Sequence, residues 1–335
     1  MSIALLFLFL WYASGNFSEY SVRILNDIAI FAMLATSYNL INGVTGQFSL
    51  EPNGFIAIGA YVSATLTLTP DQKEAMFVIK PMVHSLQMIH LPFFPAIIVG
   101  GLVTASIGFL LAFPVFRVRG DYLAIVTLGF GLIIRVILNN AISITNGPLG
   151  LKGICAYTNL WWSWGWLVFS LIVIMSLVNS RYGRAMKAIR DDEDAAIAMG
   201  INSFKIKMIA FVTSAFFEGV AGGLLAHLIT TISPTMFTFL LTFNLLIIIV
   251  VGGLGSMTGS IIATVIVVWG SELLRFVDQP MHIFSLTIPG VPGMRMVVFS
   301  ILLIVVMIFA REGIMGQKEF SWNWLLGYFK GIRKK

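Results

Sequence analysis

Charge is what this sequence lacks most. Its 335 residues include only 21 Lys and Arg and 15 Asp and Glu, or 11% of the chain, whereas soluble domains carry about 25%. Hydrophobic residues make up 58%, and the mean hydropathy is +0.92. A soluble protein of this size would need a charged surface. The apolar surface of this chain must therefore face lipid. The composition predicts a polytopic membrane protein, and its net charge of +6 is explained by membrane orientation rather than by nucleic-acid binding.

Cysteine and catalytic patterns are also scarce. A single cysteine, Cys155, excludes an intrachain disulfide and a multi-cysteine metal site. No Ser-His-Asp or paired-acid arrangement stands out, and the glycine-rich run 252–260 lacks the lysine of a phosphate-binding loop. The histidines have no carboxylate at ligand spacing; they are His84, His90, His227 and His282. We therefore expect no enzymatic activity, no catalytic residue, no metal and no cofactor in this chain.

Apolar runs bounded by charges, Pro or Gly predict an all-α fold with about ten transmembrane helices. The first run has no preceding Lys or Arg, so it lacks the basic region of a signal peptide. It is also short for a span, which needs roughly 20 residues, so the count is nine if this helix is interfacial. The predicted spans are 2–14, 22–41, 54–69, 93–113, 121–138, 160–179, 208–230, 239–252, 259–275 and 293–311.

The distribution of basic residues predicts the orientation. Loop 180–207 contains six Lys and Arg, which places it in the cytoplasm. Alternating spans then put the loop with Arg117 and Arg119, and the C-terminus, on the same side. Residues 318–335 combine aromatic and basic side chains and suggest a helix on the inner leaflet, with a disordered basic end as the alternative. We thus divide the chain into a membrane domain, 1–317, and a cytoplasmic tail, 318–335.

Loop 180–207 has an internal order that predicts a short helix at about 192–199. The acidic run 191–194 precedes small residues, and an Asp there suits a helix N-cap and the helix dipole. Gly200 follows where a helix would stop. Small side chains on its surface would let another backbone approach closely. The alternative is an ordinary solvated loop that serves only as a topology signal.

Five stretches resemble the permeases of bacterial branched-chain amino acid ABC importers, and most closely their LivM-like subunits. The longest, "GRAMKAIRDDEDAAIAMGINSFKIKMIAFVTSAFFEGVAGGLLA" (183–226), is similar to the cytoplasmic loop and the helix after it. "GVTGQFSL" (43–50) matches the usual run "GxTGQxSL". The others are "GDYLAIVTLGFGLIIRVILNN" (120–140), "TNGPLGL" (145–151) and "IIIVVGGLGSMTGSIIA" (247–263).

The resemblance implies a type II-like ABC importer permease in the bacterial cytoplasmic (inner) membrane. Its expected partners are a second, LivH-like permease, two LivG/LivF-like ATPases that bind ATP and Mg, and a periplasmic or lipid-anchored substrate-binding protein. The cargo would be a branched-chain or other neutral amino acid. A urea or amide permease of the same family is the alternative. An ion-coupled secondary carrier or a purely structural subunit is favoured far less.

The resemblance also implies two groups of site residues. The first would form a coupling helix held by an ATPase: Arg184, Ala188, Arg190, Asp191, Asp192, Glu193, Ala195, Ala196, Gly200 and Ile201. The second group comes from the Gly- and Thr-containing breaks at 43–46 and 252–259, both at the predicted cytoplasmic face. It would flank an inner gate, unless its glycines only allow close packing: Thr45, Gly46, Gln47, Gly252, Gly255 and Ser256.

The chain departs from the family pattern in three places. After "GQFSL" it has "EPNGF" (51–55), where Gly and His are usual; position 132 is Leu, where an acid is common; and position 218 is Glu, where a small residue is usual. Ionisable residues inside spans are functional candidates; here they are Asp27, Arg135, Glu218, Glu272 and Arg275. Asp27 and Arg135 can snorkel, and Glu272 can pair with Arg275. Glu218 is the hardest to explain, with subunit packing or a buried neutral acid as the favoured roles.

Overall fold

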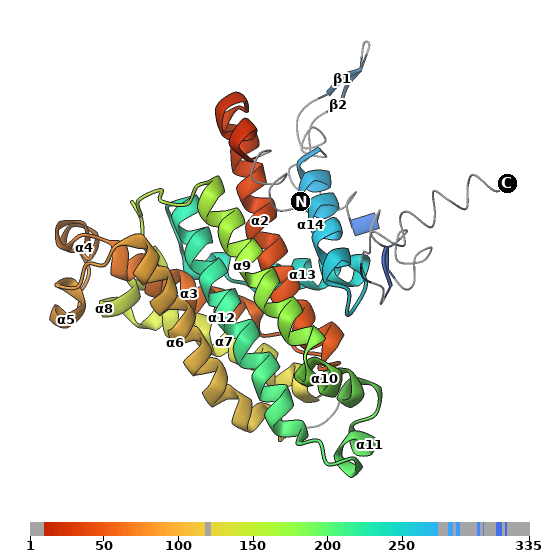
Figure 1. Cartoon of the computed structure of the whole chain (residues 1–335). Helices are drawn as coiled ribbons and strands as arrows, with labels where there is room; N and C mark the ends of the chain where they lie inside the picture. The colour runs from red at the N-terminus through yellow and green to blue at the C-terminus, as the bar shows by residue number, and fades with distance from the viewer. Residues whose placement is uncertain are drawn as a thin grey trace.

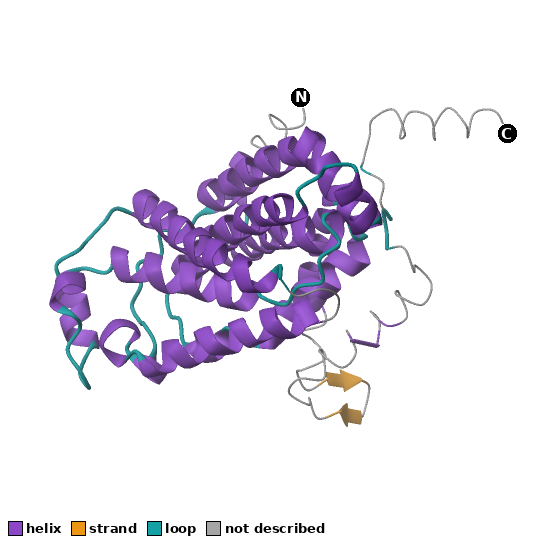
Figure 2. Cartoon of the chain, turned by 90° about the horizontal axis from the view of Figure 1, so that it is seen from below, coloured by secondary structure: helices purple, strands orange, loops and turns teal. Residues whose placement is uncertain are grey.

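The computed structural model describes residues 10–117, 122–273, 281–283, 286–288, 300–301, 304, 313–316 and 319. These residues are helical apart from loops, one isolated bridge between Leu151 and Ile232, and one antiparallel strand pair (Figure 2). The pair joins β1 (Met281–Ile283) to β2 (Leu286–Ile288), with Met281 opposite Ile288.

Helices α2 to α14 follow the chain order. The longer ones are α2 (Glu19–Asn39), α3 (Pro52–Thr67), α6 (Phe93–Val115), α7 (Tyr122–Asn140), α9 (Leu160–Asn179), α10 (Arg181–Asp191), α12 (Ser203–Ile229), α13 (Phe239–Gly252) and α14 (Met257–Leu273). The shorter ones are η1 (Leu40–Val44), α4 (Pro70–Met76), α5 (His84–Gln87), α8 (Ile142–Thr145), η2 (Gly147–Leu149), α11 (Glu193–Ala198) and η3 (Pro234–Met236).

Six of the described helical segments are long and apolar enough to cross a membrane, which supports the predicted polytopic membrane protein. They are Glu19–Val44, Phe93–Val115, Tyr122–Asn140, Leu160–Asn179, Ser203–Ile229 and Pro234–Gly252. Helix α14 is apolar but shorter. Much of the predicted span 2–14 and most of 293–311 lie outside the described residues, as does tail 318–335 apart from Glu319. The count of ten therefore stays a prediction.

Between α2 and α3 the chain breaks its helix and turns back. Helix α2 ends in the π-helical turn η1, and residues 46–51 follow without regular structure. The Tyr38 hydroxyl donates to the Ser49 carbonyl at 2.6 Å, and the Ser49 amide donates to Asn42 Oδ1 at 3.0 Å. Residues 46–51 thus run back alongside the end of α2. Irregular backbone at membrane depth is tolerated only where protein or water satisfies it.

Helix α3 consequently begins inside the bundle rather than at its end. The amide just before it, that of Leu50, donates to Thr127 Oγ1 of α7 at 2.8 Å. The amide of Asn53 donates to Thr242 Oγ1 of α13 at 3.1 Å. Both threonines lie within segments that are long and apolar enough to cross a membrane. The predicted span 54–69 is therefore a 16-residue helix, Pro52–Thr67, that starts after the chain has turned back, a feature that hydropathy alone did not indicate.

Helix α12 forms the centre of the bundle. It crosses the middle of the molecule between α9 and α6 (Figure 1) and also packs against α2 and α3. Small residues make the contacts close: a Cβ at Gly219 of α12 would lie 2.6 Å from the Thr104 Cβ of α6 and also meet Thr104 Oγ1. Membrane helices use such residues because they allow backbones to approach.

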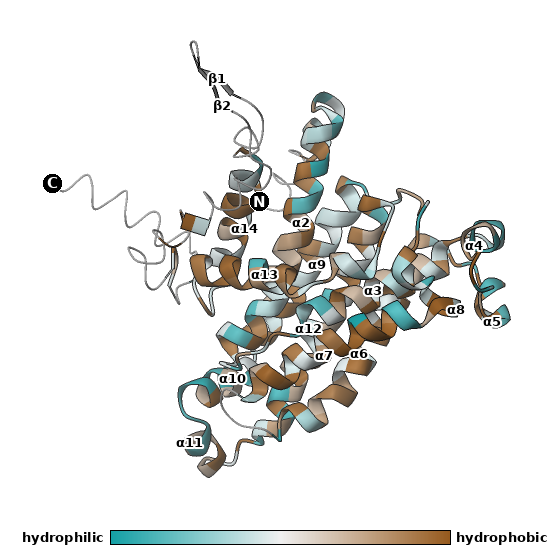
Figure 3. Ribbon diagram, turned by 180° about the vertical axis from the view of Figure 1, so that it is seen from behind, coloured by the Kyte–Doolittle hydropathy of each residue, from teal (hydrophilic) through white to brown (hydrophobic). Residues whose placement is uncertain are grey.

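Polar residues gather at the two ends of the bundle, whereas the helices between are mostly apolar (Figure 3). One end carries α10 and α11, and the other carries α4 and α5. At the second end Lys73 is buried, and its Nζ donates to the carbonyls of Leu86 at 2.8 Å and Ile89 at 2.5 Å. Burial lowers the pKa of this ammonium. The contacts fix α4 against α5.

We expect Gly219→Ala to destabilise the protein, because the added methyl must displace Thr104 and overpacking costs roughly 1–3 kcal/mol. Its matched control is Gly165→Ala in α9, where a Cβ meets no atom within 4 Å. There the better helix propensity of Ala, about 1 kcal/mol, should leave stability equal or higher. Thermal midpoints of the two variants in detergent measure the effect. Equal midpoints would contradict the close packing of α6 on α12.

Candidate functional site

Loop 180–207 folds into two helices, α10 and α11. Ser180 Oγ accepts the Tyr182 amide at 3.1 Å and caps α10, and Asp192 Oδ1 accepts the Ala195 amide at 2.9 Å and caps α11. The helix predicted at 192–199 is thus confirmed as α11. Helix α10 was not predicted, although the buried Gly183, Met186 and Ile189 follow the three-residue spacing of an amphipathic helix; this was the signal that could have found it.

Gly200 ends α11 as the sequence predicts. Its φ of +85° is a left-handed conformation that favours glycine. The Ile201 amide donates to the Ala196 carbonyl at 3.1 Å, and the Gly200 amide donates to the Ile197 carbonyl at 2.9 Å. These two bonds form a Schellman motif, which satisfies the last carbonyls of the helix. The segment therefore has a defined stop rather than a frayed end.

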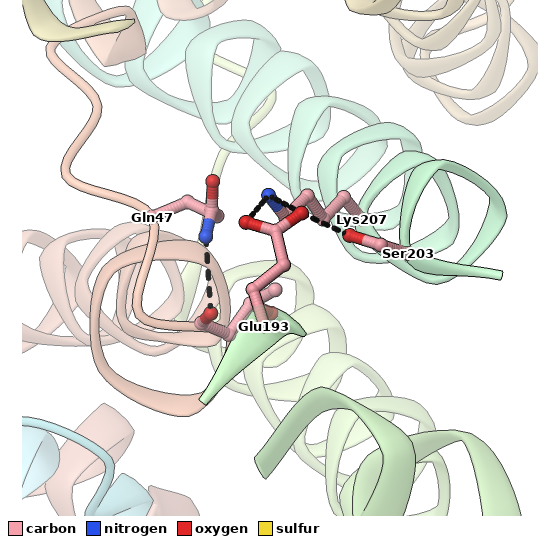
Figure 4. A network of polar contacts seen from close by, with 5 residues as sticks. Gln47, Glu193, Ser203 and Lys207 are labelled. Atoms are coloured by element: carbon pink, nitrogen blue, oxygen red, sulfur yellow. Dashed lines mark hydrogen bonds and ion pairs between the residues drawn. The ribbon is translucent and has the colours of Figure 1, made fainter. Parts of the chain in front are cut away.

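Glu193 anchors α11 to the start of α12. Both of its carboxylate oxygens accept from Lys207 Nζ at 2.7 Å, and Oε1 also accepts from the Ser203 hydroxyl at 2.5 Å (Figure 4). The Lys207 side chain is only 7% exposed, so water screens this pair little. Figure 4 also shows Gln47, whose amide donates to the Thr45 carbonyl at 3.5 Å. The Glu193 contacts therefore hold helices α11 and α12 together as one unit.

The alanines predicted for the surface of α11 face in different directions. Ala195 is exposed, whereas Ala196 is buried at 4% exposure and packs into the hydrophobic core. The expectation that both lie on the docking surface is therefore wrong for Ala196, because α11 must bury one side to stay folded. Ile197 and Met199 are 43% and 84% exposed and give the outer face of α11 an apolar character.

Arg190 links the coupling segment to both glycine segments. Its Nη1 donates to the Gly43 carbonyl at 3.4 Å. A Cβ at Gly46 would lie 2.5 Å from Arg190 Cγ, and one at Gly255 would lie 3.3 Å from Nη1. Both of these glycines have positive φ, +70° and +91°, so a side chain there would meet backbone strain as well as the arginine.

Asp191 holds the Arg190 side chain in place. Arg190 Nε and Nη2 both donate to one oxygen, Asp191 Oδ1, at 3.1 and 3.0 Å, and these bonds are charge-assisted. At the other end of α10, Arg181 Nη2 donates to the Tyr182 hydroxyl at 3.2 Å and lowers the pKa of that phenol. Arg190 is the basic side chain of α10 that turns into the bundle to reach the glycines.

Asn39 joins the two glycine segments to each other. Its Nδ2 donates to the Ser256 carbonyl at 3.0 Å and to Ser260 Oγ at 2.8 Å, while its Oδ1 accepts the Gly255 amide at 2.9 Å. Gly43 lies against the Gly255 backbone, where a Cβ would clash. Asn39 was missed from the sequence, although a polar amide inside an apolar run is a recognisable signal; in the structure it is fully buried.

The structure thus brings both groups of predicted site residues together at one end of the bundle. In the gate group, Thr45, Gly252 and Ser256 are buried, Gln47 is half-buried, and Gly46 and Gly255 contact Arg190. In the coupling group, Arg184, Asp191, Asp192, Ala195 and Gly200 are exposed, whereas Ala188, Arg190, Glu193 and Ile201 are half-buried.

Ionisable residues within the helices have varied surroundings. Glu272 of α14 accepts a hydrogen bond from the Tyr20 hydroxyl of α2; its predicted partner Arg275 lies outside the described residues. Glu218 is fully buried in α12, and so is Glu51, the residue preceding α3. Sequence reasoning noted Glu51 only as a departure from the family pattern and did not name it as a candidate site.

Comparisons with known proteins agree with these features. The profile of the family described as "Branched-chain amino acid transport system / permease component" matches residues 20–307. The chain is 36% identical over 292 residues to the permease LivM of Salmonella typhimurium, covering 77% of this chain and 64% of that protein. It is 35% identical to LivM of Escherichia coli over the same shares. The chain therefore spans somewhat less than two thirds of the length of these relatives.

A more distant similarity covers nearly the whole chain. The permease LivH of Salmonella typhimurium is 23% identical over 327 residues, or 91% of this chain and 98% of that protein. No solved structure matches. From the profile match and the LivM similarity we conclude that the chain belongs to the permease component family of branched-chain amino acid transport systems and is LivM-like.

Proposed function

We propose that the chain is the membrane permease subunit of an ATP-driven importer of branched-chain or other neutral amino acids. It works with a second, LivH-like permease, two LivG/LivF-like ATPases that hold ATP and Mg, and a periplasmic or lipid-anchored binding protein. Relatives named as permease proteins of a branched-chain amino acid transport system support the cargo. The observation that carries the proposal is the Arg190 contact, because it connects the ATPase-docking segment to the broken helices.

The coupling segment is built to transmit a rigid movement. Helix α11 is capped at both ends, and Glu193 ties it to Lys207 of α12. Arg190 ties α10 to the segments at Gly43 and Gly255. A displacement imposed on the exposed face of α11 therefore moves α12 and both glycine segments together, as rigid-body switching requires.

The membrane arrangement follows from the same proposal. The end with α10 and α11 is cytoplasmic, as its basic residues indicate, and the C-terminus lies on that side of the bacterial cytoplasmic membrane. The full type II-like permease contains about ten membrane helices, of which six full-length segments are described. Few fixed charges line these helices, which suits a neutral or zwitterionic cargo.

Reconstitution tests the proposed function directly. We expect the chain, together with its partner permease, ATPases and binding protein in proteoliposomes, to take up leucine, isoleucine or valine only when ATP is inside. Omitting the ATPases should abolish uptake, because the chain itself supplies no energy source. Uptake of urea in place of amino acids would identify an amide permease, and uptake without ATPases would overturn the proposal in favour of a secondary carrier.

Ala195→Trp should prevent ATPase docking, because a large ring on the exposed side of α11 separates the two surfaces. We expect co-purification of the ATPases to be lost while membrane insertion and thermal midpoint stay unchanged. The matched control is Ala75→Trp, at an exposed alanine of α4 on the opposite end of the bundle. Normal ATPase recovery with Ala195→Trp would show that α11 does not dock there.

Arg190→Ala should uncouple ATP hydrolysis from transport, because α11 can still dock but no longer contacts the glycine segments. We expect uptake per ATP hydrolysed to fall at least about tenfold, the loss that corresponds to about 1.4 kcal/mol of coupling. Lys187→Ala removes an exposed basic residue from the same helix and should keep the normal ratio. An unchanged ratio in Arg190→Ala would remove this residue from the coupling path.

A further inference from the structure

Residues 313–316, far along the chain, lie against the end of α13. The Ile314 amide donates to the Val251 carbonyl at 2.8 Å, and the Met315 amide donates to the Gly252 carbonyl at 3.2 Å. Both carbonyls belong to the last turn of α13, and the last four carbonyls of a helix have no partner within that helix. The segment 313–316 therefore satisfies the C-terminal end of α13.

Glu319, a few residues later, satisfies the start of α14. Its Oε1 accepts the Met257 amide at 2.7 Å, and its Oε2 accepts the Thr258 amide at 3.1 Å and the Thr258 hydroxyl at 2.8 Å. These bonds are charge-assisted and hence stronger than neutral ones. Residues 313–316 and Glu319 together, which we name the C-terminal clip, thus join the two helix ends on either side of the α13–α14 break.

Glycines let the clip reach the backbone of the break. Gly253 has a φ of +111°, and Gly313 has a φ of +77°. A Cβ at Gly313 would lie 2.6 Å from the Gly253 nitrogen, and a Cβ at Gly253 would meet the backbone of Gly316. A side chain at either glycine would be strained and would also push the two segments apart. The clip is therefore a close backbone contact and not a loose association of side chains.

The clip holds the same break that Arg190 contacts. Gly255, which lies against the Arg190 side chain, stands between the two places where the clip binds. Residues 253–256 are only four in number, and a short segment with both ends fixed has few conformations available. A movement of Gly255 relative to α13 and α14 must therefore strain the bonds of the clip or break them.

The position of the clip allows these bonds to break and form again. The Glu319 side chain is exposed, so water can replace it at the start of α14. Such a replacement would not be possible at membrane depth, where lipid offers no hydrogen bonds. The clip is thus a restraint that can be released, unlike the buried contacts of Asn39 with the same break.

We propose that the C-terminal clip restrains the α13–α14 break and opposes the movement that Arg190 transmits from the coupling segment. It thereby limits how fast ATP is hydrolysed when no cargo is delivered. This consequence rests on the proposed function, whereas the contact itself does not. The clip lies beyond residues 20–307, which the family profile matches, so membership of the family does not account for it.

Hydrogen exchange on the purified full-length chain tests the contact. Glu319→Ala should speed deuterium uptake at the amides of Met257 and Thr258 at least about fivefold, the factor that corresponds to losing a helix cap of about 1 kcal/mol. Glu74→Ala, at an exposed acid of α4, is the matched control and should leave these amides unchanged. Unchanged exchange in Glu319→Ala would overturn the clip without involving any partner subunit.

ATP hydrolysis by the reconstituted transporter tests the restraint. Without binding protein, Glu319→Ala should raise hydrolysis about fivefold, because the break then moves more easily. Glu319→Gln keeps one acceptor oxygen but no charge and should give a smaller increase. In the Arg190→Ala background Glu319→Ala should have no effect, since the break is no longer driven, whereas unrelated structural damage would add to the first substitution.

The outcomes separate this proposal from the proposed function. Normal amino acid uptake with the same hydrolysis rate in Glu319→Ala as in the unmodified chain would overturn the restraint. So would an equal increase with and without Arg190. If the unmodified transporter showed no ATP-dependent uptake, the proposed function would fail instead, and the exchange measurement would still decide whether the clip exists.

Discussion

The structure depends on how the backbone hydrogen-bonding groups are satisfied after α2 and η1 end. Between η1 and α3 the regular hydrogen bonds are missing, and lipid offers no replacement. Side chains take over: Asn42 accepts the Ser49 amide, and Thr127 accepts the Leu50 amide. Thr242 accepts the amide of Asn53 in the first turn of α3. These hydrogen bonds come from three separate helices, so the break fixes the relative positions of α2, α7 and α13.

The second break, between α13 and α14, is satisfied in a similar way and is joined to the first. Asn39 donates to the carbonyls of Gly253 and Ser256, on the two sides of Gly255, and accepts the Gly255 amide. Glu319 accepts the amides of Met257 and Thr258 at 2.7 and 3.1 Å, which satisfies the start of α14 with a negative charge where the helix dipole favours one. The two breaks thus share one polar connection at the end of the bundle that carries α10.

Much of the helical framework could be predicted from the sequence, because hydropathy and capping residues are local signals. Helices α9 and α13 begin and end at the predicted residues, and α11 lies within the predicted 192–199. The turn back before α3 could not be recognised, because nothing local in "GQFSLEPNGF" indicates it; the contacts with Thr127 and Thr242 come from distant helices. The burial of Ala196 was missed for the same reason, since only the packed bundle shows which side of α11 faces inward.

The candidate site was predicted in its parts but not in its arrangement. The charged loop and the glycine segments were each identified, yet their meeting at Arg190 depends on a long side chain crossing between elements distant in sequence. Sequence periodicity describes one helix at a time, so it cannot show which side chains of different elements come into contact.

One short segment connects the coupling contact to the buried acids. Residues 46–51 begin at Gly46, which packs against the Arg190 side chain, and end at Glu51. An extended residue spans about 3.3 Å, so the two positions are separated by at most roughly 17 Å of chain. Hydrogen bonds to side chains fix the Ser49 and Leu50 amides in this segment. The segment therefore cannot extend or bend freely. A displacement of Arg190 would therefore reach Glu51 as a movement of the α3 N-terminus.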